Sequence, residues 1–242
     1  MSPPVPNLPP ASRVLWPRTH RLVNAHFPPI DLYDDIADPA DWERVTAAVQ
    51  RTNPRILDEI GDLRLVPVER RLGGPGASWV MAAFTHVSPD RQSRFSNGGF
   101  GVYYAGESVA TALHEHSFHM GRFYRRTNEP PGWISQAREL IGRIDADLID
   151  LRIGVFPDLL DPDPECYGAA QAFAAHAREA GADGVVYPSL RRPGGECIAA
   201  FWPNVVSPPT QGDHYRYHWN GEVVDFARKI TGDRAIYDMK RY

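Results

Sequence analysis

The feature that most restricts the fold of this chain is the stretch of residues 94–124, where glycines lead into a strand-like segment and then a helix-like one. Residues 100–104, which follow glycines 98 and 99, suit a pleated and buried strand. Ser108 can cap a helix whose apolar face carries Val109, Ala112, Leu113, His116, Met120 and Phe123. A carboxylate on such a helix, packed against a strand, would lie at the wall of a cleft rather than in bulk water.

Two other segments have helical signals. Trp42, Val45, Ala48 and Val49 recur at helical spacing before Pro54, which predicts a short amphipathic helix. Further along the chain, a proline at 164, an alanine-rich run over 169–177 and a glycine at 181 are typical of a helix with its start and end signals. A third, short helix is predicted near residues 224–230.

Strands are predicted from runs of residues that suit a pleated surface, and they cover residues 79–87, 100–104, 184–187, 197–202 and 214–219. Long regular alternations of strand and helix are few, which disfavours a doubly wound parallel sheet. The expected class is α+β, with a mixed β-sheet core and flanking helices.

Residues 1–38 are rich in proline and aromatic residues and have no sustained period, so they are interpreted as an extended arm that lies over the domain or is partly disordered. The predicted division is an N-terminal arm with a short helix over residues 1–60, followed by a catalytic domain over 61–242.

Composition argues against several classes of protein. A net charge of -4 without a run of basic residues gives no reason to expect direct nucleic-acid binding. Cys166 and Cys197 are too few for a disulfide framework, which favours reduced thiols in the cytoplasm. The first residues lack the pattern of a secretory signal, and the uncharged stretch 72–89 is too polar and too broken for a membrane span. A cytoplasmic protein without a membrane segment is expected.

The candidate chemistry gathers between residues 94 and 122. Arg94 offers a forked, permanent cation for a pyrophosphate, and the nearby glycines let backbone amides approach phosphate oxygens. Tyr104 can stack on a nicotinamide or ribose ring. A glutamate at 115 can stabilise the positive charge that grows on a ribose when its glycosidic bond breaks. It shares one helix face with Thr111, His119 and Arg122.

Each of these residues also has a plainer interpretation. A lone arginine near a turn, a tyrosine pair in a strand and one helical glutamate are each more often structural or solvated. A metal hydrolase using His114, Glu115, His116 and His119 is disfavoured, because His114 and His119 lie five residues and about 140° apart on a helix. No metal site is expected. A non-catalytic interaction protein, binding through its aromatic arm, is a third possibility.

The order of the motifs resembles the RES-domain toxin family. Its pattern is matched over about residues 65–205 by Arg94-Phe95, Tyr103-Tyr104-Ala105, Ala112-Leu113-His114-Glu115, Asp183-Gly184-Val185-Val186-Tyr187-Pro188-Ser189 and Ala199-Ala200-Phe201. The resemblance implies a fold similar to the diphtheria-type ADP-ribosyltransferases, NAD as substrate, and an Xre-like antitoxin as partner.

The same resemblance implies site residues. Glu115, Arg94 and Ser189 are the catalytic candidates, and Tyr104, His119 and an early arginine complete the NAD site. Arg70 and Arg71 both suit that early position, and Arg71 is preferred because Leu72 follows it. The expected reaction cleaves the nicotinamide–ribose bond and transfers ADP-ribose to a protein, because an N-terminal arm longer than that of compact family members favours a protein substrate over simple loss of NAD. Phosphate or water is the alternative acceptor, which would make the chain an NAD phosphorylase or glycohydrolase.

Overall fold

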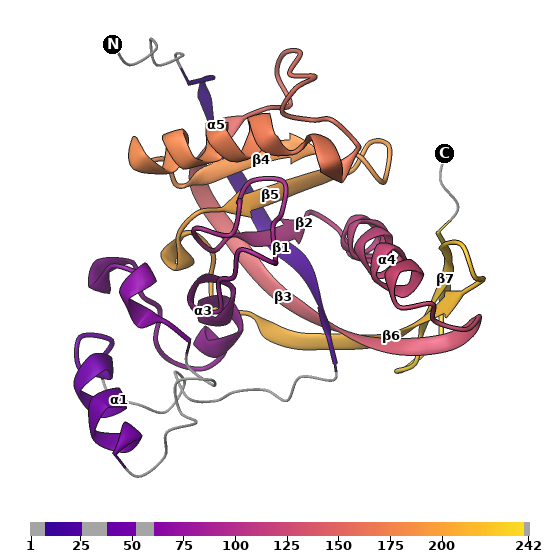
Figure 1. Ribbon diagram of the computed structural model, residues 1–242, viewed down its shortest axis with the longest axis horizontal. Coiled ribbons are helices and arrows are strands. Elements are labelled where there is room, and N and C mark those ends of the chain that lie inside the picture. The colour runs from indigo at the N-terminus through magenta and orange to yellow at the C-terminus, as the bar shows by residue number, and fades with distance from the viewer. Residues whose placement is uncertain (1–7, 26–37, 52–60, 240–242) are drawn as a thin grey trace.

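One long strand, β3 (Gly132–Asp150), organises the sheet in the computed structural model, which describes residues 8–25, 38–51 and 61–239 (Figure 1). It pairs antiparallel with β1 (Ala11–Asn24) and with β6 (Thr210–Trp219). At its end it runs parallel to β4 (Gly184–Pro188), to which α5 (Gly168–Glu179) provides the crossover.

The strand order closes part of the sheet on itself. The order is β1-β2-β5-β4-β3-β6-β7-β8, and β1 also pairs with β3. Strands β2 (Tyr103–Gly106) and β5 (Glu196–Ala200) therefore complete a ring with β1, β3 and β4, joined at one point by the pairing of His20 with Gly106. Strands β6, β7 (Val224–Lys229) and β8 (Ile236–Asp238) extend the sheet from the first half of β3.

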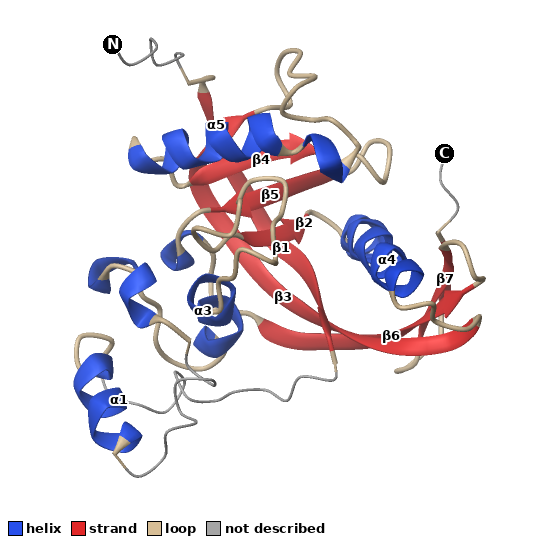
Figure 2. Cartoon of the chain, in the orientation of Figure 1, coloured by secondary structure: helices blue, strands red, loops and turns tan. Residues whose placement is uncertain are grey.

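Helices pack on both faces of the β4–β5 pair, and Figure 2 shows α5 running along it. On one face, alanines of α5 pack with alternate residues of the two strands, namely Val185, Cys197 and Ala199. On the other face, α3 (Ala77–Thr85) packs with the intervening residues Val186, Ile198 and Ala200. The strands are therefore apolar on both faces, which explains their near-continuous hydrophobic runs.

The longest helix, α4 (Val109–Arg126), follows β2 after a two-residue turn. The Oγ of Ser108 accepts a hydrogen bond from the backbone N–H of Thr111 and caps the helix. Leu113 and Tyr124 pack against β6, where Tyr217 and other aromatic residues are buried. The apolar face thus fixes the rotation of α4, and Glu115 lies on a different face from this core.

Several predicted elements are confirmed. The α+β class, with a mixed sheet and flanking helices, is confirmed, as are α4, α5 and the strands near β2, β4, β5 and β6. The helix after residue 41 is α1 (Trp42–Gln50), anchored by the buried ring of Trp42. The proline at 164 starts a separate 3-10 turn before α5. No helix among the described residues is long and apolar enough to cross a membrane.

Other predictions were wrong. The strand predicted over 79–87 is the helix α3, because a short run buried nearly all round has no period that separates helix from strand. The helix predicted over 224–230 is β7, which gains its hydrogen bonds from β6. The arm predicted over 1–38 contains β1, which belongs to the sheet instead of lying over the domain. Residues 1–7 and 26–37 of that arm lie outside the described residues.

The close packing of α3 on the segment before β2 depends on Gly101. A Cβ atom at Gly101 would collide with the backbone of Ala83 and Phe84. We expect Gly101→Ala to lower the free energy of unfolding by roughly 2 kcal/mol, measured by urea denaturation. Gly168→Ala is the control, since a Cβ there meets nothing within 4 Å. Equal stability of the two variants would contradict this account of the packing.

Candidate functional site

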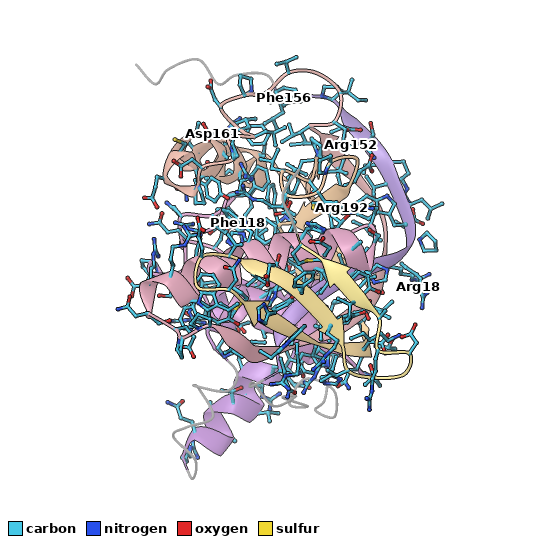
Figure 3. The ribbon with its side chains drawn as sticks, turned by 90° about the vertical axis from the view of Figure 1, so that its right-hand side faces the viewer. Arg18, Phe118, Arg152, Phe156, Asp161 and Arg192 are labelled. Atoms are coloured by element: carbon cyan, nitrogen blue, oxygen red, sulfur yellow. The ribbon has the colours of Figure 1, made fainter. Side chains whose placement is uncertain are left out.

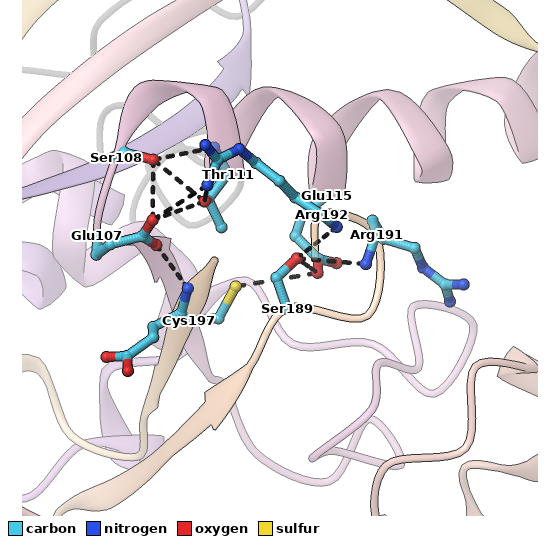
Figure 4. A network of polar contacts seen from close by, with 9 residues as sticks. Glu107, Ser108, Thr111, Glu115, Ser189, Arg191, Arg192 and Cys197 are labelled. Carbon is cyan, nitrogen blue, oxygen red and sulfur yellow. Dashed lines mark hydrogen bonds and ion pairs between the residues drawn. The ribbon is translucent and has the colours of Figure 1, made fainter. Parts of the chain in front are cut away.

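Glu115 and Ser189 meet at the junction of α4 and the loop between β4 and β5 (Figure 4). The Oγ of Ser189 donates a hydrogen bond of 2.6 Å to Oε1 of Glu115, across 74 positions of sequence. The Oγ of Ser189 also accepts hydrogen bonds from the backbone N–H groups of Arg191 and Arg192. The serine hydroxyl is therefore oriented from both sides, with its proton directed to the carboxylate.

A second carboxylate, Glu107, fixes the loop against the start of α4 (Figure 4). It accepts hydrogen bonds from the hydroxyls of Ser108 and Thr111 and from the backbone N–H of Glu196. A Cβ atom at Gly195 would collide with Oγ1 of Thr111, so only glycine allows this approach. The distance between Ser189 and Glu115 is therefore set by rigid neighbours.

Cys197 lies beneath the pair as a neutral thiol. Its Sγ is 3.9 Å from Oε1 of Glu115, with the thiol as donor. Burial, followed by the negative charges of Glu115 and Glu107, raises the pKa of the Cys197 thiol well above its usual range. The thiol is thus a weak donor to the carboxylate and not a nucleophile.

Arg94 is buried, and its guanidinium group is directed to the segment after β3. It donates hydrogen bonds to the carbonyl oxygens of Asp161 (2.6 Å) and Leu159 (3.3 Å), and it lies over the ring of Tyr167. The hydroxyl of Tyr104 accepts a hydrogen bond from the backbone N–H of Phe95, the residue next to Arg94. Burial raises the pKa of Tyr104 to about 12, so this phenol stays protonated.

His119 lies in a basic environment on the Glu115 side of α4. Desolvation of the imidazole ring by the neighbouring protein lowers the pKa of His119, although part of the residue is open to solvent. Cations near His119 lower that pKa further, and they are Arg191, Arg122 and Arg94. Three guanidinium groups therefore produce a positive potential at His119, one helical turn after Glu115, which favours an anionic ligand there.

The early arginines lie elsewhere. Arg71 is almost fully buried and bonds Glu43 and the backbone carbonyl oxygens of Leu63, Val66 and Pro39. Its guanidinium group binds the region around α1, so the position of Arg71 does not support the preference for it as a pocket residue.

Arg70 is also directed away from the pair. It forms an ion pair with Asp183 and lies over the ring of Trp202. A basic residue that the motif order missed is Arg21 of β1, which donates to the carbonyl oxygen of Tyr104 and lies over the ring of Tyr103. Its distance in sequence from the motifs left no local signal for this contact.

The histidines of α4 do not converge with Glu115. His116 points to the sheet, where its Nδ1 lies 2.8 Å from the hydroxyl of Tyr217. His114 lines a separate pocket of about 430 Å³ between α4 and β7, together with Phe118, Arg125 and Arg191. This divergence argues against the arrangement that a metal hydrolase would need. Arg191 borders both this pocket and the surroundings of His119.

The structure brings four of the predicted residues together as two pairs. Glu115 and Ser189 are in direct contact, and Arg94 and His119 lie within electrostatic range of each other. Sequence reasoning missed the contributions of Glu107 and Arg191. Two consecutive arginines after Ser189 were a visible signal for Arg191. Nothing in the sequence specified the direction of the side chains of Glu107 and Arg191.

The fold and the site define a class: an α+β protein with a carboxylate–hydroxyl pair beside a cluster of arginines. A family profile described as RES domain matches residues 68–220. Since this match spans more than half of the chain, the chain belongs to the RES-domain family, which confirms the resemblance predicted from the ordered motifs.

Two similar proteins accompany this match. The "Uncharacterized protein y4oC" of Sinorhizobium fredii (strain NBRC 101917 / NGR234) is 29% identical over 207 residues, which cover 85% of this chain and 84% of that protein. A chain in the crystal structure of the M. tuberculosis MbcT-MbcA toxin-antitoxin complex is 12% identical, with a TM-score of 0.43 and coverage of 88% of both chains.

The environment of His116 predicts sensitivity to acid. Burial, followed by the nearby His119 and Arg21, lowers the pKa of His116 from 6.5 to about 3. The unfolded chain therefore binds this proton more readily than the folded chain as the pH falls below 6.5. We expect His116 alone to reduce the free energy of unfolding by roughly 2 kcal/mol between pH 8 and pH 5.

The measurement is urea denaturation at several pH values. His116→Gln keeps a hydrogen-bonding group near Tyr217 and should show a shallower loss of stability in acid. His176→Gln, on α5, is the matched control and should keep the wild-type slope. A slope that is unchanged in His116→Gln would show that other groups cause the acid sensitivity.

Proposed function

We propose that this chain is an NAD-consuming toxin of a toxin–antitoxin module, which cleaves the nicotinamide–ribose bond and transfers ADP-ribose to a protein. The observation that carries the proposal is the 2.6 Å hydrogen bond between Ser189 and Glu115 beside a cluster of arginines. Membership of the RES-domain family supports the toxin role.

The pair suits a reaction in which positive charge develops on a ribose. As the bond between nicotinamide and the anomeric carbon breaks, its electron pair leaves with nicotinamide and the ribose becomes oxocarbenium-like. The Glu115 carboxylate stabilises that charge or orients a ribose hydroxyl. Ser189 fixes the position of the carboxylate relative to the ribose. A nucleophile then forms the new bond at the anomeric carbon and loses its proton.

The other predicted residues take binding roles in this proposal. Arg94 contacts the phosphates, His119 borders them, and Tyr104 supports the nicotinamide end through its ring. The buried thiol of Cys197 stays protonated and helps to keep Glu115 in place. Regulation by an Xre-like antitoxin belongs to the proposal as well, because a host needs to restrain an enzyme that consumes NAD.

We expect Glu115→Gln to slow the release of nicotinamide from NAD by more than about a hundredfold, equivalent to ~2.7 kcal/mol of transition-state stabilisation. The loss follows from removing the negative charge beside the developing cation. Chromatography of the products, with lysate present to supply acceptors, makes the measurement. Ser189→Ala should slow the reaction less, by roughly tenfold, because the carboxylate remains.

Glu179→Gln, at the end of α5, is the matched control and should keep wild-type activity. Urea denaturation of each variant separates a folding defect from a catalytic one. If the folded wild-type chain releases no nicotinamide from NAD even with lysate, the proposed function is wrong.

The acceptor is tested separately. With NAD labelled in its adenylate phosphate, we expect label to appear on a protein of the lysate. The preference for a protein acceptor rested on the N-terminal arm, and it loses the support of residues 11–24, which are part of the sheet. Loss of NAD without labelled protein would assign the acceptor as phosphate, if activity depends on added phosphate, or otherwise as water.

A further inference from the structure

Three arginines from separate parts of the chain converge on one loop. Arg94 precedes β2, Arg122 lies on α4, and Arg191 lies between β4 and β5. All three guanidinium groups bond residues 159–167, a segment that we name the strap. The same three cations surround His119. The strap therefore contacts three arginines whose charges also act on His119.

The contacts of Arg191 and Arg122 resemble those that these arginines would make with an anion. Nη2 of Arg191 donates to the carbonyl oxygen of Pro162, while its guanidinium lies 3.5 Å from the centroid of the Phe118 ring. Nη2 of Arg122 lies 2.9 Å from a carboxylate oxygen of Glu165. With the two carbonyl oxygens bonded by Arg94, the strap presents oxygen atoms to every arginine of the cluster.

The start of the strap region is held more firmly than its middle. Before the strap, Arg152 bonds the buried Asp150 through two nitrogens and also bonds Glu196. Phe156 and Leu160 pack on the core beneath α5. In Figure 3, Arg152 and Phe156 lie near the top of the molecule and Asp161 lies above Phe118 of α4. The acidic middle thus spans from an anchored start to the basic face of α4.

The contacts in the middle are individually weak. Pro162 and Asp161 offer neutral carbonyl oxygens, and the side chain of Glu165 is 75% exposed, so its ion pair with Arg122 contributes little. Hydrogen bonds from arginine to phosphate are charged on both sides and about twice as strong as those to neutral groups. A diphosphate would therefore compete well with the strap for the three arginines.

The position of the cluster relative to Glu115 suits one dinucleotide. Arg122 follows Glu115 by seven residues on α4, which is about 10 Å along the helix axis. A ribose at Glu115 would thus have its diphosphate near the arginines and His119.

We propose that Arg94, Arg122 and Arg191 form a subsite for the diphosphate of a dinucleotide, and that the strap occupies this subsite until the diphosphate displaces it. The inference rests on the proposed function only for the identity of that dinucleotide. Binding of substrate then includes an opening step, in which carbonyl and carboxylate oxygens of the chain are exchanged for phosphate oxygens.

The test uses inorganic pyrophosphate as the probe and calorimetry of the full chain as the measurement. Arg122→Gln should weaken pyrophosphate binding by about tenfold, because it removes one cation of the subsite. Glu165→Gln should strengthen binding by roughly threefold, because it removes the charged competitor of the strap. Hydrogen exchange of the strap should become faster when pyrophosphate is bound.

Two controls separate local contacts from net charge. Arg125→Gln removes a cation of α4 that lines the other pocket, and Asp158→Asn removes a carboxylate just before the strap. Both should leave pyrophosphate affinity within about twofold of wild type. Three outcomes would each overturn the inference. They are equal effects of Glu165→Gln and Asp158→Asn, slower hydrogen exchange in the strap when pyrophosphate is bound, and no binding of pyrophosphate.

Pyrophosphate binding needs no nicotinamide chemistry, so the two proposals fail separately. A chain that binds pyrophosphate as expected but never releases nicotinamide keeps the subsite and loses the proposed function. A chain that consumes NAD while Arg122→Gln and Glu165→Gln leave pyrophosphate binding unchanged keeps the function and loses the subsite.

Discussion

Backbone pairing along β3 is the constraint on which the rest of the structure depends. This single strand forms ladders with β1, β4 and β6, so it connects the closed part of the sheet to its three-stranded extension. Leu140, Ile144 and Leu148 are at most 1% exposed, and each contributes roughly 2 kcal/mol by burial. The strands that flank the site, β2, β4 and β5, are positioned through this framework.

The site shows how a rigid framework can direct a few polar groups. Glu107 and Gly195 bring the loop after β4 onto the start of α4, and Ser189 thereby reaches Glu115. The Glu115 carboxylate accepts from the hydroxyl of Ser189 and from the thiol of Cys197, which burial keeps neutral. One side of α4 therefore combines the carboxylate of Glu115 with positive charges one to two turns away, an arrangement that agrees with the proposed dinucleotide substrate.

The parts of the fold that could be predicted from the sequence have local signals. Ser108 caps α4, and the alanines of α5 precede a glycine, so both helices were recognised. Strand β3 was missed because glycines and charged residues interrupt its apolar residues and lower its apparent strand propensity. The assignments of α3 and β7 were wrong because tertiary packing, not local propensity, decides between helix and strand in short apolar runs.

The candidate site was predictable only as a set of residue types. The order of motifs identified Glu115 and Ser189, which the structure brings into contact. The position of Arg71 could not be predicted, because its partners belong to the region around α1. The contacts of the strap were equally hidden, since carbonyl oxygens have no signature in a sequence and their direction is a property of the folded backbone.

The pairing of β1 with β3 also has a consequence for the biosynthesis of the chain. Arg13 and Asp147, which face each other across this pair, are 134 positions apart. During synthesis, β1 therefore cannot pair with β3 until more than half of the chain has been made, and such non-local pairing slows folding. Because β4 and β5 emerge later still, the Glu115–Ser189 pair forms only when translation is nearly finished, so a chain that stops before β4 lacks this pair.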